Sequence, residues 1–194
     1  ISKRVGMNNK IFYLFKIRSM SLKSNINFTS TSKNDPRLTS IGMFIRKFKL
    51  DELPQFINVL LGSMSVVGPR PQIYEETLKY TNFERKLFNA KPGITDFSSI
   101  IFSDEGDIIS NADNPDEAYD KIIRPYKSRL GIFYIEKQNL LLDVFLIFST
   151  LRVIISREKT LHSISNKLNR YGANKDLVDV SKRDKKIKII NLPS

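Results

Sequence analysis

The stretch LDELPQ at residues 50–55, followed by GSMSVVGPRP at residues 62–71, is the part of the chain around which the rest is organised. Its first part places two adjacent carboxylates, Asp51 and Glu52, at the start of a short segment with apolar residues at helical spacing. Its second part holds Arg70 between two prolines, whose rings fix the backbone φ and stiffen the loop. A rigidly held guanidinium binds phosphate oxygens in a bidentate way. The stretch therefore predicts phosphate chemistry with a divalent metal.

The acid pair admits two interpretations. In the first, Asp51 is a nucleophile or a ligand of a hard cation such as Mg²⁺, which prefers carboxylate oxygens and leaves positions open for phosphate. In the second, Asp51 caps the following helix and Glu52 favours its first turn, where the helix dipole stabilises negative charge. The pair by itself favours capping, and Arg70 shifts the balance toward phosphate binding.

Composition limits the classes of protein that the chain can belong to. At 194 residues, with 41% hydrophobic and 27% charged residues, it is long enough for one globular domain. The absence of cysteine excludes disulfides and thiolate metal sites, and suits a reducing compartment. A single histidine, His162, makes a Ser-His-Asp triad or a His-rich zinc site implausible. A phosphate-binding P-loop is rejected, because Pro69 follows Gly68 where that motif has lysine.

The net charge of +12 is unevenly distributed along the chain. Residues 1–50 carry eleven basic residues and one acid, residues 51–156 have a net charge of −4, and residues 157–194 have one of +6. A basic front and tail suit an anionic surface such as phospholipid, a phosphate-bearing substrate or nucleic acid, although a merely solvated basic face is the simpler alternative. No stacking-aromatic motif or recognition helix supports the last class, so we expect no nucleic-acid partner.

Apolar periodicity and turn residues predict a mixture of helices and short strands. We expect strands over residues 11–18, 64–67 and 94–102, and helices over residues 40–48, 53–61, 72–90, from 114 onward and over 140–155. In a regular strand, Lys16 and Arg18 would project from the same face. Residues 140–155 are too few for a membrane span and include Asp143 and Arg152, which favours a buried or interfacial helix. Residues 19–36 are predicted to form a surface loop.

Motifs across some 155 residues then resemble one known family, the bacterial sugar transferases, which are monotopic polyprenyl-phosphate phosphoglycosyl transferases. The matching segments, in the order of the family, lie at residues 3–6, 16–20, 38–46, 50–55, 58–60, 64–71, 91–95, 125–127, 134 and 142–143. The combination of residues 50–55 with residues 68–71 is highly specific. Departures from the family pattern are Ile17 in place of Phe, Ser63 in place of an acid, and Asp96 in place of Gly.

The resemblance implies transfer of a sugar 1-phosphate from a UDP-sugar to undecaprenyl phosphate, forming undecaprenyl-diphospho-sugar and UMP. This reaction initiates the assembly of exopolysaccharide, O-antigen, capsule or glycoprotein glycans. The resemblance further implies that Asp51 attacks to give a covalent phosphosugar intermediate in a ping-pong scheme and binds Mg²⁺, and that Glu52 assists. Arg70 would hold substrate phosphate, and Arg46 would lie near the lipid headgroups.

Lys16 and Arg18 are the remaining candidate substrate-binding cations, although each alone is compatible with a surface charge. We expect a mixed α+β fold with a small sheet, in which residues 1–156 form the catalytic domain and residues 157–194 a basic C-terminal tail. The expected place is the cytoplasmic face of the bacterial inner membrane, on anionic lipid, with a homodimer as one option for assembly. The family's N-terminal re-entrant membrane helix would precede Ile1 and is missing from this chain. The rival hypothesis is an inactive truncated relative that serves as a membrane-surface interaction module.

Overall fold

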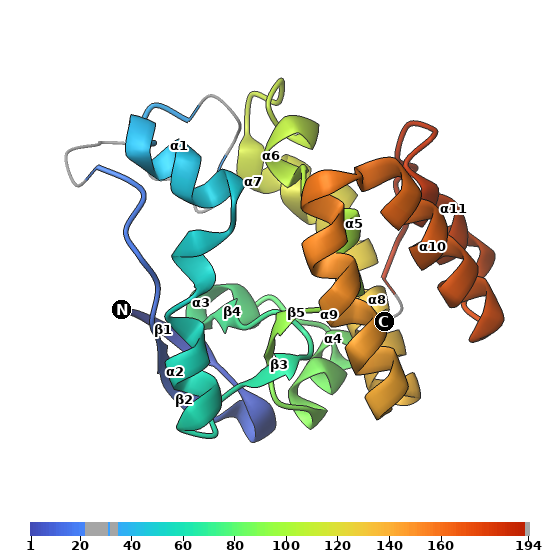
Figure 1. Ribbon diagram of the computed structural model, residues 1–194, viewed down its shortest axis with the longest axis horizontal. Coiled ribbons are helices and arrows are strands. Elements are labelled where there is room, and N and C mark those ends of the chain that lie inside the picture. The colour runs from blue at the N-terminus through green and yellow to red at the C-terminus, as the bar shows by residue number, and fades with distance from the viewer. Residues whose placement is uncertain (22–30, 32–34, 193–194) are drawn as a thin grey trace.

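The computed structural model describes residues 1–21, 31 and 35–192 (Figure 1), so most of the loop expected over residues 19–36 lies outside the described residues. The fold is a single domain of helices with little sheet, as the sequence predicted. The strands are β1 (Ser2–Val5), β2 (Ile11–Leu14), β3 (Ser65–Val67), β4 (Gln72–Ile73) and β5 (Gly93–Thr95). They form an antiparallel sheet in the order β2-β1-β4 and a separate parallel pair, β3-β5.

The longest helices lie in the second half of the chain. Before β5 the helices are α1 (Ser40–Lys47), α2 (Gln55–Leu60), α3 (Tyr74–Thr77) and α4 (Asn82–Arg85). After it come α5 (Phe97–Ile101), α6 (Glu105–Ile108), α7 (Pro115–Ala118), α8 (Arg124–Lys137), α9 (Leu140–Ile155), α10 (Arg157–Arg170) and α11 (Lys175–Lys182). The short helical turns are η1 (Met7–Asn9), η2 (Leu50–Glu52), η3 (Lys86–Asn89) and the π-helical η4 (Tyr119–Ile123).

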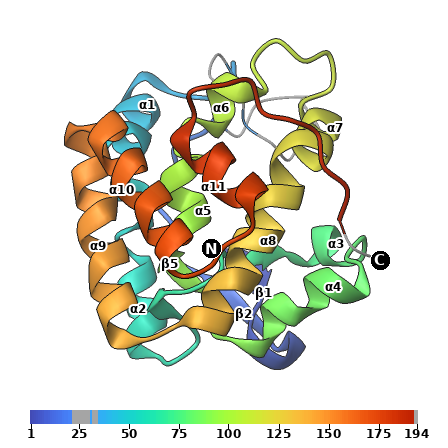
Figure 2. The ribbon, with the colours of Figure 1, turned by 90° about the vertical axis from the view of Figure 1, so that its right-hand side faces the viewer.

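The main hydrophobic core lies among α5, α8, α9, α10 and α11, which pack side by side in Figure 2. Its largest fully buried side chains include Phe97, Ile100, Leu130, Leu146 and Ile164. Residues 157–182, part of the segment expected to be a basic tail, therefore contribute helices to this core. Helix α10 packs against the core through its apolar stripe, in which Leu161, Ile164 and Leu168 recur at helical spacing.

Several local predictions are confirmed. The helix expected over residues 40–48 is α1, and the Thr39 side chain accepts a hydrogen bond from the Gly42 backbone N–H, as an N-cap does. The short strand expected over residues 64–67 is β3, and the long apolar segment over residues 140–155 is α9. Among the described residues, no helix has both the length and the apolar character that crossing a membrane requires.

Other local predictions are wrong. The strand expected over residues 11–18 ends at Leu14, so Lys16 and Arg18 share no strand face. The strand expected over residues 94–102 stops after Thr95, because Asp96 accepts hydrogen bonds from Ser99 N–H and starts α5. The helix expected over residues 72–90 is divided into α3, α4 and η3, with Thr81 and Glu84 forming a capping box that begins α4.

The helix after the acid pair differs most from expectation. It begins at Gln55, after the turn η2, so Asp51 does not cap it. Its buried residues are the polar Gln55 and Asn58, whereas Phe56 and Leu60 are 47% and 88% exposed. Asn58 accepts a hydrogen bond from Phe15 N–H at 3.0 Å and donates one to the Tyr13 carbonyl at 2.8 Å. The buried polar side of α2 therefore ties the acid-pair segment to the end of β2 and to the residue after it.

Candidate functional site

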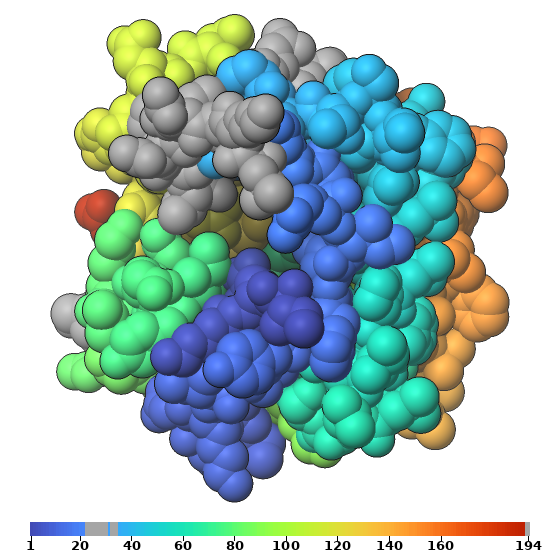
Figure 3. All heavy atoms as spheres, turned by 90° about the vertical axis from the view of Figure 1, so that its left-hand side faces the viewer, coloured from blue at the N-terminus to red at the C-terminus, as the bar shows by residue number. Residues whose placement is uncertain are grey.

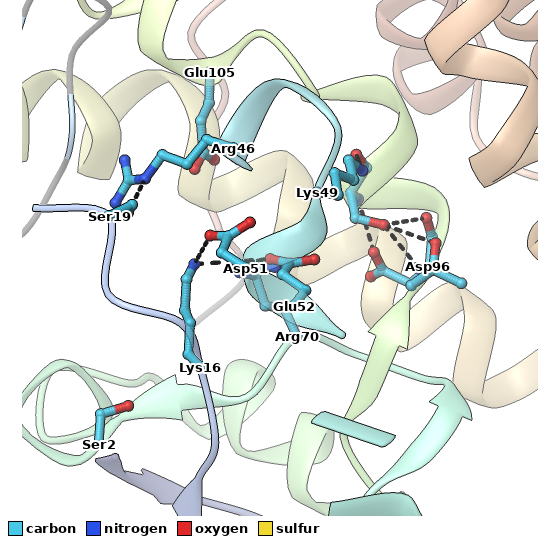
Figure 4. A network of polar contacts seen from close by, with 12 residues as sticks. Ser2, Lys16, Ser19, Arg46, Lys49, Asp51, Glu52, Arg70, Asp96 and Glu105 are labelled. Atoms are coloured by element: carbon cyan, nitrogen blue, oxygen red, sulfur yellow. Dashed lines mark hydrogen bonds and ion pairs between the residues drawn. The ribbon is translucent and has the colours of Figure 1, made fainter. Parts of the chain in front are cut away.

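A cavity of about 470 Å³ lies beside the acid pair, a volume in the range of small-molecule sites. Asp51, Glu52, Lys16, Arg46 and Arg70, five of the six residues predicted to form the site, line this cavity. They come from the chain after β2, from α1, from η2 and from the loop after β3, and Figure 4 shows them converging. The fold therefore brings together residues that are up to 54 positions apart in the sequence.

Asp51 lies in the wall of this cavity and is only 3% exposed. Its Oδ2 is 2.8 Å from Lys16 Nζ, which approaches from the segment after β2 (Figure 4). The backbone fixes this approach, because Ile17 N–H donates a hydrogen bond to the Asp51 carbonyl at 3.1 Å. A buried carboxylate needs such a partner to offset the loss of hydration. Lys16 is therefore the group that holds and neutralises Asp51.

Glu52 is paired with the predicted arginine. Its Oε1 accepts a hydrogen bond from Arg70 Nη2 at 2.9 Å and lies 4.0 Å from Lys16 Nζ. Burial would raise the pKa of Glu52, but the charges of Arg70 and Lys16 outweigh burial and lower the pKa below its ordinary value. The carboxylate of Glu52 raises the pKa of Arg70 in turn. Two neighbouring ion pairs, Asp51–Lys16 and Glu52–Arg70, thus form one wall of the cavity.

The loop that carries Arg70 is held by the parallel pair β3-β5. Gly93 N–H donates a hydrogen bond to the Pro69 carbonyl at 2.9 Å, and Gly68 N–H donates one to the Thr95 carbonyl at 3.0 Å. A Cβ atom built on Gly93 would lie 2.1 Å from Gly68 N, so the two backbones can approach this closely only as glycines. This contact explains why the two glycine-proline motifs, far apart in the sequence, serve the same site.

The other two predicted cations are placed differently. Arg46 lines the cavity, and its Nε donates a hydrogen bond to Ser19 Oγ at 2.8 Å (Figure 4). Arg18 is exposed and is not among the residues that line the cavity. The early end of β2 explains the difference, because beyond Leu14 the chain no longer alternates as a strand and only Lys16 turns toward the acid pair.

Several charged residues of the cavity were missed by sequence reasoning. Lys127 and Glu105 form an ion pair in its wall, and Arg4 and Lys49 also line it. Burial and the nearby Arg70 lower the pKa of Arg4 to about 10. Lys49 directly precedes the matched motif and Arg4 lies in another matched segment, so position gave a signal for both. Glu105 and Lys127 carried none, because they meet only in the folded chain.

Asp96, the residue that replaces a family glycine, also borders the cavity. It is 1% exposed and accepts hydrogen bonds from Ser99 N–H and from the Ser98 hydroxyl. Burial raises the pKa of this carboxyl above its ordinary value, although those hydrogen bonds act in the opposite direction. Its contacts are those of a helix cap, so its effect on the cavity is to set the start of α5.

The carboxylates of the cavity are the groups that could bind a magnesium ion. Among the described residues, no group of three or more His, Cys, Asp or Glu side chains could hold a metal. Asp51 and Glu52 are adjacent carboxylates on the cavity wall, and Mg²⁺ is commonly bound by one or two carboxylates together with substrate phosphates and water. The residues therefore fit a metal that is bound jointly with a phosphate substrate.

A large apolar surface lies on one side of the molecule. We call it the apolar face, and it consists of exposed side chains on α1, α2, α9 and the turns beside them. Figure 3 shows α1 and α2 beside the edge of α9, and Figure 2 places the same three helices along one side. Its most exposed members are Ile41, Leu60, Leu61, Leu140, Leu141, Phe148 and Ile155. Exposed apolar side chains that gather on one side of a protein are typical of a binding surface.

Comparison with known proteins shows which family the chain is similar to. The family model described as "Bacterial sugar transferase" matches residues 1–157. Galactosyl transferase CpsE of Streptococcus agalactiae is 35% identical over 164 residues, covering 78% of this chain and 33% of that protein. Undecaprenyl-phosphate galactose phosphotransferase of Salmonella typhimurium is 33% identical over 172 residues, covering 80% and 33%.

A third relative is more similar over a shorter segment. The UDP-glucose:undecaprenyl-phosphate glucose-1-phosphate transferase of Escherichia coli is 44% identical over 101 residues, covering 50% of this chain and 22% of that protein. The chain thus spans about a third or less of the length of these curated relatives. The family match nevertheless includes every predicted site residue and extends to the first residue of α10. The chain belongs to the bacterial sugar transferase family.

Proposed function

We propose that this chain transfers a sugar 1-phosphate from a UDP-sugar to undecaprenyl phosphate, with Asp51 as the nucleophile. The observation that carries the proposal is the convergence of the Asp51–Lys16 and Glu52–Arg70 pairs in one cavity. The relatives support the substrate class, since their names include undecaprenyl-phosphate phosphotransferases that act with galactose and glucose. The proposal does not specify which sugar is transferred, because the shared motifs mark the reaction and not the sugar.

The proposed reaction has two displacements at one phosphorus atom. An Asp51 carboxylate oxygen attacks the β-phosphorus of the UDP-sugar, the bond to the bridging oxygen breaks, and UMP leaves with that electron pair. An oxygen of undecaprenyl phosphate then attacks the same phosphorus, and the bond to Asp51 breaks, which restores the carboxylate. Asp51 begins and ends the cycle ionised, so no net proton transfer is required of it.

The cations of the cavity prepare this chemistry. Lys16 holds Asp51 at 2.8 Å and can shift to the incoming phosphate when the carboxylate forms its new bond. Arg70, positioned by the β3-β5 contact, offers its remaining N–H groups to phosphate oxygens while Glu52 fixes its orientation. Mg²⁺ held by Asp51, with Glu52 beside it, would neutralise phosphate charge when bound. Preorganised charge of this kind is the main requirement of phosphoryl transfer.

The apolar face supports a membrane setting for the proposed reaction. We infer that α1, α2 and α9 rest on anionic lipid, which would bring the cavity to the headgroup level where undecaprenyl phosphate lies. The first 50 residues carry a net charge of +10, which complements an anionic leaflet. Apolar side chains inserted at the interface would add to that attraction. A homodimer formed through the same face is the competing assembly, and it predicts association in the absence of lipid.

The decisive experiment is a screen for UMP release across UDP-sugars with undecaprenyl phosphate, using the full-length protein. Asp51→Asn removes the nucleophile and is expected to lower the rate by a factor on the order of 10⁴ or more. Asp179→Asn, which changes an exposed acid on α11, is the matched control and should retain the full rate. Full activity of Asp51→Asn would eliminate the nucleophile assignment, and activity undiminished by a chelator would eliminate the metal.

A further inference from the structure

Lys49 lies at the turn between α1 and the acid pair, and its backbone is left-handed, with φ 55° and ψ 24°. This conformation ends α1 just after its C-cap, Phe48. Glycine or asparagine usually occupies such a position, because other side chains are strained there. The backbone conformation therefore gives no reason for a lysine at position 49, so any advantage of lysine there comes from its side chain.

The side chain of Lys49 enters the cavity wall on the side of the acid pair that faces α5 (Figure 4). Its ammonium donates one long hydrogen bond, of 3.4 Å, to the Ser99 carbonyl. Among the described residues it forms no ion pair, although Glu52 and Asp96 line the same cavity. An ammonium has three donors, and a half-buried one with a single weak partner has capacity for a further acceptor.

Among the described cations that line the cavity, Arg4 and Arg46 resemble Lys49 in having no carboxylate partner, since each donates to a serine hydroxyl, whereas three others differ. Lys16, Arg70 and Lys127 each contact a carboxylate of the cavity. Arg183 is the closest counterpart, because it also follows a helix with a left-handed backbone, at φ 55°. Its guanidinium reaches Asp104 Oδ2 at 3.0 Å. The same local geometry thus delivers one cation to a carboxylate and Lys49 to the cavity.

We propose that Lys49 binds a phosphate group of the substrate beside Asp51. The proposal rests on the proposed function, which supplies phosphate-bearing substrates to this cavity. An ammonium binds non-bridging phosphate oxygens as a point charge, which complements the planar fork of Arg70 on the other side of the acid pair. The phosphate belongs either to the nucleoside diphosphate or to the lipid phosphate, and the experiment below separates these two sources.

The test is Lys49→Asn, which removes the cation but tolerates the left-handed backbone. The full-length variant is titrated calorimetrically with UDP and, separately, with decyl phosphate as a soluble lipid-phosphate analogue. We expect about tenfold weaker binding of at least one probe, which corresponds to about 1.4 kcal/mol. The thermal midpoint should stay the same or rise, because asparagine relaxes the strained backbone. The control is Lys47→Asn, which removes an equal charge two residues away, at the exposed end of α1.

The outcomes are distinct. Weakening with UDP alone assigns Lys49 to the nucleotide phosphates, weakening with decyl phosphate alone assigns it to the lipid phosphate, and weakening with both assigns it to a shared position. Unchanged binding of both probes overturns the proposal, as does an equal loss in Lys47→Asn or a lowered thermal midpoint that accompanies the loss. Wild-type protein that binds neither probe overturns it as well. Absence of UMP release by wild-type protein that still binds UDP would refute the proposed function and leave Lys49 to be judged by binding.

Discussion

The helices α2 and α10 both carry apolar residues at helical spacing, yet they bury opposite kinds of side chain. In α10 the apolar stripe of Leu161, Ile164 and Leu168 is buried against the core. In α2 the buried residues are Gln55 and Asn58, and the apolar side chains are exposed. Periodicity therefore shows that a helix has an apolar side, but it does not show what covers that side.

The reason for the difference is the surroundings of each helix. α10 lies between α9 and α11, so its apolar stripe meets other apolar side chains. α2 lies at an edge, where β2 and the residue that follows it offer backbone groups that Asn58 can satisfy. The hydrogen bonds of Asn58 replace water on the inner side, and the apolar residues remain for a partner outside the protein. Helix α10 therefore completes the core, whereas α2 presents its apolar side at the surface.

The largest expected effect tests the buried stripe of α10. Ile164→Asp places an unpaired carboxylate at a position with 0% exposure, and we expect it to prevent folding or to lower the free energy of unfolding by more than about 4 kcal/mol. Ile164→Val is the milder variant and should cost about 0.5–1.5 kcal/mol. Urea denaturation measures both. If Ile164→Asp were as stable as wild type, α10 would not belong to the core.

An intermediate effect tests the polar side of α2. Asn58→Ala leaves Phe15 N–H and the Tyr13 carbonyl without their side-chain partner, and we expect a loss of about 1–3 kcal/mol in the free energy of unfolding. Because these bonds anchor the segment that carries Lys16, UMP release should fall as well. Asn166→Ala, on the exposed surface of α10, is the control and should change stability by less than about 0.5 kcal/mol. Equal stability of the two variants would show that the inverted burial of α2 contributes nothing.

The smallest expected effect on stability tests the apolar side of α2. Leu60 is 88% exposed, so Leu60→Asp should change the free energy of unfolding by less than about 0.5 kcal/mol. The same variant should bind phosphatidylglycerol vesicles about tenfold more weakly, because one leucine less enters the interface. Sedimentation with vesicles measures this, and Ile189→Asp, at an exposed position outside the apolar face, is the control. Unaltered vesicle binding with loss of self-association would favour the dimer instead.

Much of the candidate site could be predicted because short sequence motifs contain its charged side chains. Asp51, Glu52 and Arg70 were identified from adjacent carboxylates and from a guanidinium held between prolines. Strand alternation predicted that Lys16 and Arg18 project from the same face, and this prediction is wrong because β2 ends at Leu14. Strand ends depend on pairing partners, and β1 pairs with β2 only as far as that residue. Local pattern cannot reveal where a pairing partner stops.

The capping prediction for Asp51 failed for a related reason. A carboxylate before an apolar-periodic segment is typical of a helix start, but here a turn intervenes and α2 begins at Gln55. The alternative that the residues also allowed, a site carboxylate, agrees with the cavity and with the contact to Lys16. The contact to Lys16 involves a residue 35 positions earlier in the chain, which no spacing rule within the motif contains.

The sequence by itself determined the kinds of group that this protein brings to its site: two carboxylates, an arginine between two prolines and an excess of cations. These groups lie in motifs that identify the family. The sequence also determined α1, from its apolar stripe, and α9, from its long apolar run. Only the tertiary structure decided which cations meet the acids, that Lys49 faces the cavity with a single weak partner, and which sides of α2 and α10 are covered. Motif and periodicity are properties of neighbouring residues, whereas pairing and burial depend on segments that meet only after folding.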